Sequence, residues 1–329
     1  MNQPRKLYSS LIGSFALALA CVYALPGAAQ NYPAKPVRII IPFAPGGSND
    51  ILGRMIGTRL SELSGQQFIM DNRGGAGGTI GMDLATRASP DGYTLVIGHI
   101  GTLAVNPTLY PKLSYDPVKD LQPVSMFAKV ANMLAVHPSL PARSVREFID
   151  LAKAKPGALS YGSGGTGGGG HLAMEYFKLL ANIDCVHVPY KGTAPAIVDL
   201  LAGQTQVVFA GIPPVAVHVR AGRLRALGVS TNRRLAIFPE LPTVAESGVP
   251  GFEATQWYGL AAPAGTASAI VDILNRYMRS AIQNPKVEQR LVDEGAEAAA
   301  STPDEFAAFI KNEITRWRPV VKSIAIRAE

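Results

Sequence analysis

The stretch Tyr161–Leu172, YGSGGTGGGGHL, decides both the fold and the candidate site. Seven of the ten residues from Tyr161 to Gly170 are glycine. A short apolar run that ends at Tyr161 predicts a strand before the glycines, and a helical pattern begins at Leu172. Glycines let the backbone approach a ligand closely, and the first N–H groups of a helix have no partner inside it. A strand, a glycine loop and a helix in this order therefore predict an anion-binding site.

A second junction of this kind lies early in the chain, at Pro42–Asp50 (PFAPGGSND). It follows the β-branched run Val37–Phe43, which predicts a buried strand, and it precedes a helical stripe that Gly65 ends. The two junctions are far apart in the sequence, and each can hold negative charge without a basic side chain. Together they predict a ligand cleft between two lobes.

The segments around the early junction predict a parallel sheet. Strands are expected at Phe68–Asp71 and Thr94–Gly98, with a third glycine-rich junction at Asn72–Gly81 between them. A short helical piece is expected to begin at Gly101 and Thr102. This βαβαβ order implies right-handed crossovers, and it gathers the loops at the carboxyl edge of the sheet.

The remainder of the chain predicts a second α/β lobe and a return to the first. The apolar stretch Pro123–Val136 is the expected first crossing, and Glu253–Pro263 (EATQWYGLAAP) is the expected return. Three helices should finish the chain. The predicted fold class is α/β, with two lobes that each hold a mostly parallel sheet flanked by helices. The predicted boundaries are a signal peptide at 1–29, lobe one at 30–130 plus 255–329, and lobe two at 131–254.

The first 29 residues have the features of a secretory signal peptide. Arg5 and Lys6 form a basic start, Leu11–Ala24 is apolar, and small residues precede Gln30. The apolar stretch is short for a membrane span, which needs about 20 residues. We therefore expect an exported protein of the bacterial periplasm. The alternative is a lipoprotein signal acylated at Cys21, although the position three before it is Ala18 rather than leucine.

Composition excludes some classes of partner. The 329 residues are 47% hydrophobic and 17% charged, with a formal net charge of +7. No basic run with interleaved aromatic residues occurs, so nucleic acid is not an expected partner. Loss of Cys21 with the signal peptide would leave Cys185 alone and preclude an intrachain disulfide. Cys185 lies in an apolar run and is expected to be a small buried hydrophobe.

The sequence contains no complete motif for a cofactor, a metal or a catalytic site. Gly162, Gly164 and Gly167 match the dinucleotide pattern G-x-G-x-x-G, but Asp184 precedes its strand instead of ending it, where the acid should lie. No Gly-Lys-Ser/Thr follows a glycine run, which excludes a P-loop. The five histidines have no metal-ligand spacing. Ser163 lies outside a G-x-S-x-G motif, and no acid–histidine pair is indicated. We therefore predict no cofactor, no metal and no catalytic residue.

Several polar and aromatic residues near the junctions have alternative roles. Asp50 in the first turn of a helix favours a structural role through the helix dipole over ligand contact. His171 could bond a carboxylate or serve the structure. Trp257 and Tyr258 are expected in the core or hinge, with an aromatic lid as the alternative. The cations Lys191 and Arg223 are expected to face solvent.

Nine segments of the mature chain together resemble the periplasmic receptors of tripartite tricarboxylate transporters, also called Bug proteins. They occur in order and at sensible spacing over nearly all of the mature chain. The segments are YPAKPVRIIIPFAPGG, NRGGAGGTIG, NPTLY, YGSGGTGGGGHL, HVPYKG, LAGQ, AGRLRALGVS, PTVAESGVPGFE and WYGLAAPAGT. The resemblance implies a Venus-flytrap fold, no catalysis, and capture of a small carboxylate largely by main-chain N–H groups and ordered waters.

The resemblance also implies which residues bind the ligand. Many family members carry an acid where this chain has Ala210, so a ligand with an apolar or anionic distal end is expected. Longer polar side chains than Thr166, and serines at Gly168 and Gly169, are also common in the family. The implied ligand-binding residues are Phe43, Ala44, Pro45, Gly46 and Gly47 in lobe one, Gly101 and Thr102 in a further loop, and Ser163, Gly164, Gly165, Thr166, Gly167, His171 and Ala210 in lobe two.

The sequence thus predicts a periplasmic solute-binding receptor for a small organic carboxylate. Its implied partners are the ligand and the membrane permease subunits of a tripartite transporter, and a monomer is expected. One alternative is an exported enzyme, an esterase or oxidoreductase, that uses the glycine-rich loop. Another is a ligand-sensing subunit, which the sequence does not separate from a transport receptor.

Overall fold

The computed structural model describes residues 32–324, and residues 33–324 form one compact unit. The predicted signal peptide at 1–29 and the alternative acylation at Cys21 lie outside the described residues. Within residues 32–324, none of the helices combines the length and the apolar character that a bilayer span requires.

Sheet A has six strands in the order β11-β4-β10-β3-β1-β2. Strand β1 pairs in parallel with β2 and β3, as the βαβαβ pattern predicts. Strand β10 lies antiparallel between β3 and β4, and β11 is antiparallel to β4. The strands span Val37–Ile41 (β1), Phe68–Asn72 (β2), Thr94–His99 (β3), Leu121–Val130 (β4), Gln256–Pro263 (β10) and Ala296–Ala298 (β11).

Sheet B has five strands in the order β7-β6-β8-β5-β9. Strand β6 is parallel to β7 and β8, whereas β5 runs antiparallel between β8 and β9. Both sheets are therefore mixed, with antiparallel strands where the chain has just crossed between sheets. The strands span Asn132–Val136 (β5), Ser160–Ser163 (β6), Val186–Pro189 (β7), Val207–Gly211 (β8) and Arg225–Val229 (β9).

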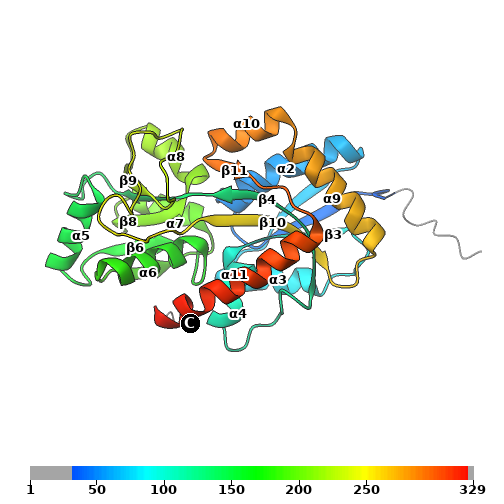
Figure 1. The fold of residues 1–329 in the computed structure, drawn as a ribbon, viewed down its shortest axis with the longest axis horizontal. Helices are drawn as coiled ribbons and strands as arrows, with labels where there is room; N and C mark the ends of the chain where they lie inside the picture. The colour runs from blue at the N-terminus through cyan, green and yellow to red at the C-terminus, as the bar shows by residue number, and fades with distance from the viewer. Residues whose placement is uncertain (1–31, 325–329) are drawn as a thin grey trace, which may run out of the picture. The chain divides into compact units, whose positions relative to one another are not determined.

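Helices flank both sheets (Figure 1). Those beside sheet A are α2 (Ser48–Ser64), α3 (Thr79–Thr86), α4 (Asn106–Leu109), α9 (Ser268–Ile282), α10 (Pro285–Asp293) and α11 (Pro303–Ser323), with the short turns η1 (Ala76–Gly78) and η2 (Gly101–Val105). Those beside sheet B are α5 (Val145–Ala154), α6 (Gly169–Ala181), α7 (Thr193–Leu201) and α8 (Ile212–Arg220).

Local sequence explains several helix ends. Gly65 adopts φ of 73° and closes α2 through an N–H bond to the Ser61 carbonyl, as a left-handed cap should. At α11, Thr302 and Glu305 form a reciprocal capping box. At α5, Ser144 accepts from the Glu147 N–H, but the Glu147 carboxylate accepts from Arg143 N–H instead. The carboxylate of Glu147 thus bonds the residue before the N-cap instead of the N-cap itself.

The chain passes between the sheets twice, and the two crossings are bonded together. The first lies between β4 and β5, so the apolar stretch predicted as a crossing also carries two strands. The second lies between β9 and β10. The Asn132 amide donates to the Ala254 carbonyl at 2.6 Å, and the Ser230 hydroxyl donates to the same carbonyl at 2.8 Å. The two crossing segments therefore form one polar junction between the sheets.

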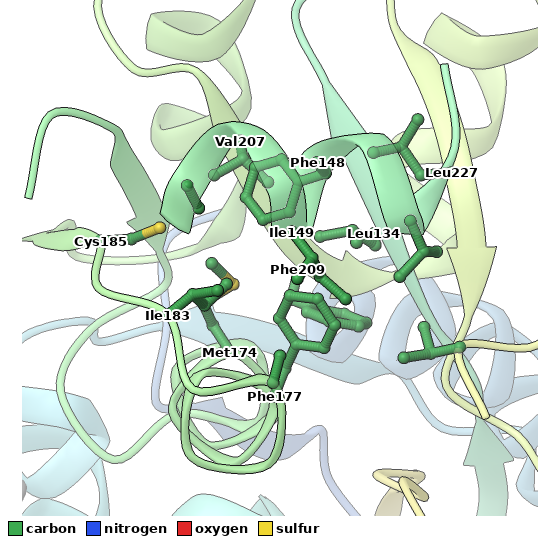
Figure 2. Packing of buried hydrophobic residues seen from close by; sticks show 14 of the residues in the cluster. Leu134, Phe148, Ile149, Met174, Phe177, Ile183, Cys185, Val207, Phe209 and Leu227 are labelled. Atoms are coloured by element: carbon green, nitrogen blue, oxygen red, sulfur yellow. The ribbon is translucent and has the colours of Figure 1, made fainter. Parts of the chain in front are cut away.

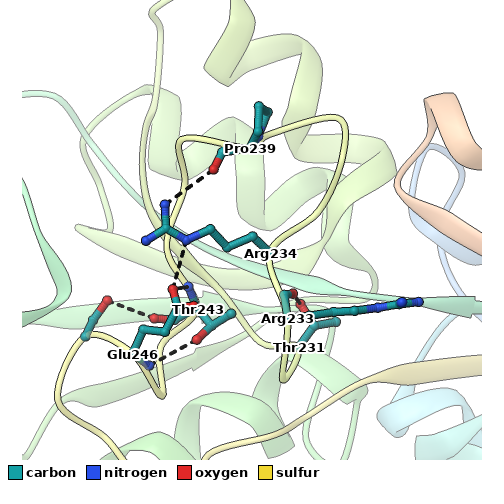
Figure 3. Close-up of polar contacts among 7 residues, drawn as sticks. Thr231, Arg233, Arg234, Pro239, Thr243 and Glu246 are labelled. Carbon is teal, nitrogen blue, oxygen red and sulfur yellow. Dashed lines mark hydrogen bonds and ion pairs between the residues drawn. The ribbon is translucent and has the colours of Figure 1, made fainter.

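The return segment after β9 is ordered by its own polar contacts (Figure 3). Arg234 Nε donates to Glu246 at 3.0 Å, and Arg234 Nη1 reaches the Pro239 carbonyl at 3.4 Å. The Thr243 hydroxyl accepts from the Glu246 N–H while the Glu246 carboxylate accepts from the Thr243 N–H. This reciprocal pair folds a long connection back onto sheet B.

An aromatic-rich core lies beneath sheet B (Figure 2). The rings of Phe148 (α5) and Phe177 (α6) are tilted with their centroids 6.1 Å apart, and Phe209 of β8 meets Phe177 edge-on at 6.0 Å. Cys185 is 2% exposed within this cluster, as the prediction of a small buried hydrophobe requires. Burial raises the pKa of its thiol to about 11, so the sulfur is an unreactive neutral group.

Candidate functional site

Two helix N-termini converge on one cavity of about 30 Å³. Helix α2 begins after Gly47, and α6 begins after Gly168. None of the lining side chains is that of an acid, a lysine or an arginine. The cavity is lined by Phe43, Gly47, Ser48, Asn49, His99, Gly164, Gly168, Gly169, Gly170, Thr193, Gln256 and Tyr258.

The backbone N–H groups at these helix starts are the main donors of the cavity. The N–H groups of Asp50 and Ile51 already bond to the Gly47 carbonyl, and that of Leu172 bonds to the Gly168 carbonyl. The first two residues of each helix are Ser48 and Asn49 in α2 and Gly169 and Gly170 in α6. Within residues 32–324, the N–H groups of these four residues have no hydrogen-bond acceptor. Since both helix dipoles add positive potential here, the cavity suits an anion.

Asp50 holds the first glycine loop rather than lining the cavity. Its carboxylate accepts from the Gly46 N–H at 2.9 Å and from the Asn72 amide at 3.0 Å, and Arg54 pairs with it at 2.8 Å. Burial alone would raise the pKa of Asp50, but these bonds, led by that from Arg54, hold it below its usual range. The Asn72 amide also donates to the Phe43 carbonyl at 3.0 Å. The side chain therefore has the structural role that its place in the first turn favours.

The stacked imidazole rings of His171 and His187 support the glycine loop that follows β6. His171 Nδ1 accepts from the Gly167 N–H at 3.0 Å, and its ring stacks on His187 at 3.9 Å. His187 Nε2 lies 2.7 Å from the Ser163 hydroxyl, which also accepts from the Gly165 N–H. Burial, with weaker effects from neighbouring charges, lowers the pKa of both histidines to about 3. Both rings are therefore neutral at pH 7, and His171 serves the loop as an acceptor.

The Ser163–His187 contact was not predicted, yet it lacks the third member of a catalytic triad. Among the residues that the structure describes, His187 has no hydrogen bond to a carboxylate that could orient its ring. The Ser163 hydroxyl is also 1% exposed and engaged by the Gly165 backbone. These contacts indicate that the Ser163 hydroxyl stabilises the loop and does not act as a nucleophile.

His99 is a cavity residue that the sequence analysis missed. Its Nδ1 accepts from the Thr102 N–H at 3.2 Å, so the neutral ring carries its proton on Nε2. Burial lowers the pKa of His99 to about 4, and its ring packs against Phe43 at 4.7 Å. Its position in the sequence could have indicated this role, because His99 ends β3 and the loops of the site follow the carboxyl ends of strands in the same sheet.

Strand β10 supplies two further cavity residues, Gln256 and Tyr258. The Tyr258 hydroxyl donates to Gln256 Oε1 at 2.8 Å, and the Gln256 amide donates to Asn132 at the crossing. Trp257 points to the other face, where its indole N–H donates to Glu313 of α11 at 2.9 Å. Trp257 therefore belongs to the core, whereas Tyr258 is a buried wall of the cavity.

Three of the predicted site residues, Phe43, Gly47 and Gly164, line the cavity directly. The others lie mostly in the loops around it. The Ala44 N–H donates to the Lys191 carbonyl at 3.0 Å, and the Thr166 carbonyl accepts from Tyr110 at 3.1 Å, so loops of the two sheets touch. Pro45, Gly46, Gly101, Thr102, Ser163, Gly165, Gly167 and His171 flank these contacts without lining the cavity, and Ala210 packs in an apolar cluster of sheet B.

The structure has two sheets flanked by helices, two hydrogen-bonded crossings between them, and a cavity lined by backbone N–H donors. These features define the class of two-lobed solute-binding proteins. A family model for the tripartite tricarboxylate transporter family receptor matches residues 52–326, and the chain belongs to this family.

Known relatives agree with this family and with the resemblance seen in the sequence. The chain is 39% identical to the protein BugT of Bordetella pertussis over 98% of both chains. It is 38% identical to a solved structure, R. palustris Rpa4515 with adipate, with a TM-score of 0.88, 90% of this chain and 99% of that chain covered. A further structure, MatC (Rpa3494) from Rhodopseudomonas palustris with bound malate, is 32% identical with a TM-score of 0.85, covering 88% and 100%.

Proposed function

We propose that this receptor binds one carboxylate group of a small organic acid in the cavity between the starts of α2 and α6. The observation that carries the proposal is the convergence of two helix N-termini on a cavity without charged side chains. Oriented N–H groups can replace the water around a carboxylate without the added charge of a lysine or arginine. Lys191 and Arg223 are both exposed and lie outside the lining.

The relatives of this chain indicate which acids should be tested first. Two relatives with solved structures hold the dicarboxylates adipate and malate, which supports a dicarboxylate as the first class to test.

We further propose that the chain is exported to the periplasm and serves a tripartite transporter. The signal-like first 29 residues and the family support this localisation. The family description supports membrane permease subunits as the partner that receives the ligand. We propose no catalysis, because the Ser163–His187 pair lacks an orienting acid among the described residues.

The test is ligand binding by the mature protein from Gln30 onward, measured by thermal shift and titration calorimetry. An acid at about 100 times its dissociation constant should stabilise the fold by about 2.7 kcal/mol. The variant Gly169→Ala should lose this binding, because its added Cβ would lie 2.5 Å from the Gln256 side chain and fill the cavity. Thr315→Ala, at an exposed position of α11, is the control. Binding of a nucleotide but of no acid would overturn the proposal.

A further inference from the structure

A groove of about 870 Å³ lies on the opposite face of strand β10 from the anion cavity. Trp257 lines this groove, whereas the next residue of the strand, Tyr258, lines the cavity. Successive side chains of a strand point to opposite faces, so β10 separates the two spaces. Ala131 of the first crossing and Thr255 of the second also line the groove. We call it the hinge groove, because it lies along the segments that join the two sheets.

The two walls of the hinge groove belong to different sheets. One wall is the return segment after β9, where Leu235 and Ile237 pack against the apolar cluster of sheet B. The other wall consists of α10, β11 and part of α11. Strand β11 pairs with β4 of sheet A, and Phe309 of α11 meets Trp257 edge-on at 5.1 Å. Each wall should therefore move with its own sheet.

The two crossings lie between the ligand cleft and the hinge groove. On the cleft side, loops of the two sheets touch. The Ala44 N–H donates to the Lys191 carbonyl at 3.0 Å, and the Tyr110 hydroxyl donates to the Thr166 carbonyl at 3.1 Å. A rotation about the crossings that separates these loops brings the walls of the groove together, because the walls lie on the other side of the same axis. This structure thus combines a closed cleft with an open groove.

Among residues 32–324, no ion pair spans the hinge groove. The pairs beside it each join two residues of the same wall. Arg234 pairs with Glu246 at 3.0 Å in the return segment, and Arg316 pairs with Glu313 at 3.2 Å in α11. The walls are therefore not held at this separation by charge, and they are free to approach each other when the cleft opens.

Opposite charges face each other across the groove. Figure 3 shows the Arg233 side chain extending away from the Arg234–Glu246 pair, and Arg233 lines the groove. The exposed acids Glu288 of α10 and Glu297 of β11 line the opposite wall. As the walls approach, attraction between these charges should favour the open form slightly, because exposed pairs are weak and screened by salt.

We propose that the hinge groove sets the ligand affinity of the receptor, because the cleft opens only as far as the groove can narrow. This inference rests on the proposed function and adds a control site outside the cavity. Any group that fills the groove should hold the cleft closed and tighten binding, since the open form is then disfavoured. If about a tenth of the free protein is closed, holding all of it closed tightens binding about tenfold.

Tryptophan substitutions on the two walls test this proposal. Ala236 of the return segment and Val292 of α10 line the groove, are exposed, and do not line the cavity. Calorimetry of the mature protein with adipate and with malate should show roughly three- to tenfold tighter binding in Ala236→Trp and in Val292→Trp. Small-angle X-ray scattering without ligand should show a smaller radius of gyration in both variants.

The matched control is Val198→Trp, which adds the same side chain at a 62% exposed position of α7 outside both spaces. It should have the affinity and the radius of gyration of the wild type. Unchanged or weaker binding in both groove variants, with the wild-type radius, would overturn the role of the groove. If neither acid binds any form of the protein, the proposed function fails, whereas the scattering comparison still tests the groove.

Arg233→Glu tests the groove without added bulk. It replaces attraction across the groove by repulsion from Glu288 and Glu297, so the open form should be less favourable and affinity should rise about twofold. The long-range effect of losing a positive charge has the opposite sign, because it would weaken binding of an anion. Tighter binding therefore identifies the effect of the groove, and weaker binding would contradict the attraction assigned across it.

Discussion

At the scale of single residues, the buried histidines should make stability depend on pH. Burial lowers the pKa of His99 to about 4 and that of His171 to about 3, against an ordinary value of 6.5. Below pH 6.5 the unfolded chain therefore binds protons that the folded protein does not. The free energy of unfolding should fall as the pH drops from 6.5 towards 4, by up to about 1.4 kcal/mol per pH unit for each histidine.

Urea unfolding at a series of pH values between 7.5 and 4.5 measures this slope. His99→Asn and His171→Asn each remove one titrating ring and should flatten the curve between pH 6 and 4.5. If the unfolding free energy of both variants falls with pH in parallel with that of the wild type, other groups cause the loss of stability. Above pH 7 the slope from these histidines should vanish, because both states are then neutral at these rings.

At the scale of elements, the start of α2 depends on Asp50. Its carboxylate holds the Gly46 N–H and the Asn72 amide, so Asp50→Ala leaves both donors without a charged acceptor. The expected cost is about 1.5–3 kcal/mol of unfolding free energy. Ligand affinity should fall as well, because the loop that presents the α2 N–H groups loses its brace. Chemical denaturation and calorimetry measure the two effects.

The matched control is Asp83→Ala on α3, which removes an exposed ion pair with Arg87. Such a pair contributes about 0–1 kcal/mol, and α3 does not reach the cavity. Equal losses of stability in the two variants would contradict the role given to Asp50. A stability loss without any loss of affinity would show that the loop keeps its shape without this carboxylate.

The same scale explains which elements the sequence could predict. The glycine loops before α2 and α6 and the cap at Gly65 follow from local sequence patterns, although α6 begins at Gly169, three residues before the expected Leu172. The insertion of β10 beside β3 was not predicted, because it pairs Tyr258 with His99 from a distant part of the chain. That pairing is what brings His99, Gln256 and Tyr258 to the cavity. Sequence analysis therefore placed the glycine loops but missed His99 and Gln256 opposite them, and it gave Tyr258 a place near the ligand only as an alternative.

At the scale of the whole molecule, contacts between loops of the two sheets should set the equilibrium between closed and open forms. The Ala44 N–H donates to the Lys191 carbonyl, and Gly74 lies against both groups. A Cβ at position 74 would lie 2.7 Å from the Lys191 oxygen and 2.9 Å from the Ala44 nitrogen. Gly74 is outside the cavity lining, so Gly74→Ala should act as a wedge between the loops without touching the ligand.

A ligand that contacts both sides binds the closed form better, so any cost to closure lowers its affinity. A wedge that costs about 1.4 kcal/mol should weaken binding about tenfold. Calorimetry measures that loss, and small-angle X-ray scattering should show a larger radius of gyration at a subsaturating ligand concentration. In Gly162→Ala the added Cβ lies nearest to Ala196 of α7, at 3.2 Å and beside the same sheet B, so that variant should change the melting temperature rather than closure. Unchanged affinity in Gly74→Ala, with the wild-type radius of gyration, would mean that binding does not require these loops to meet.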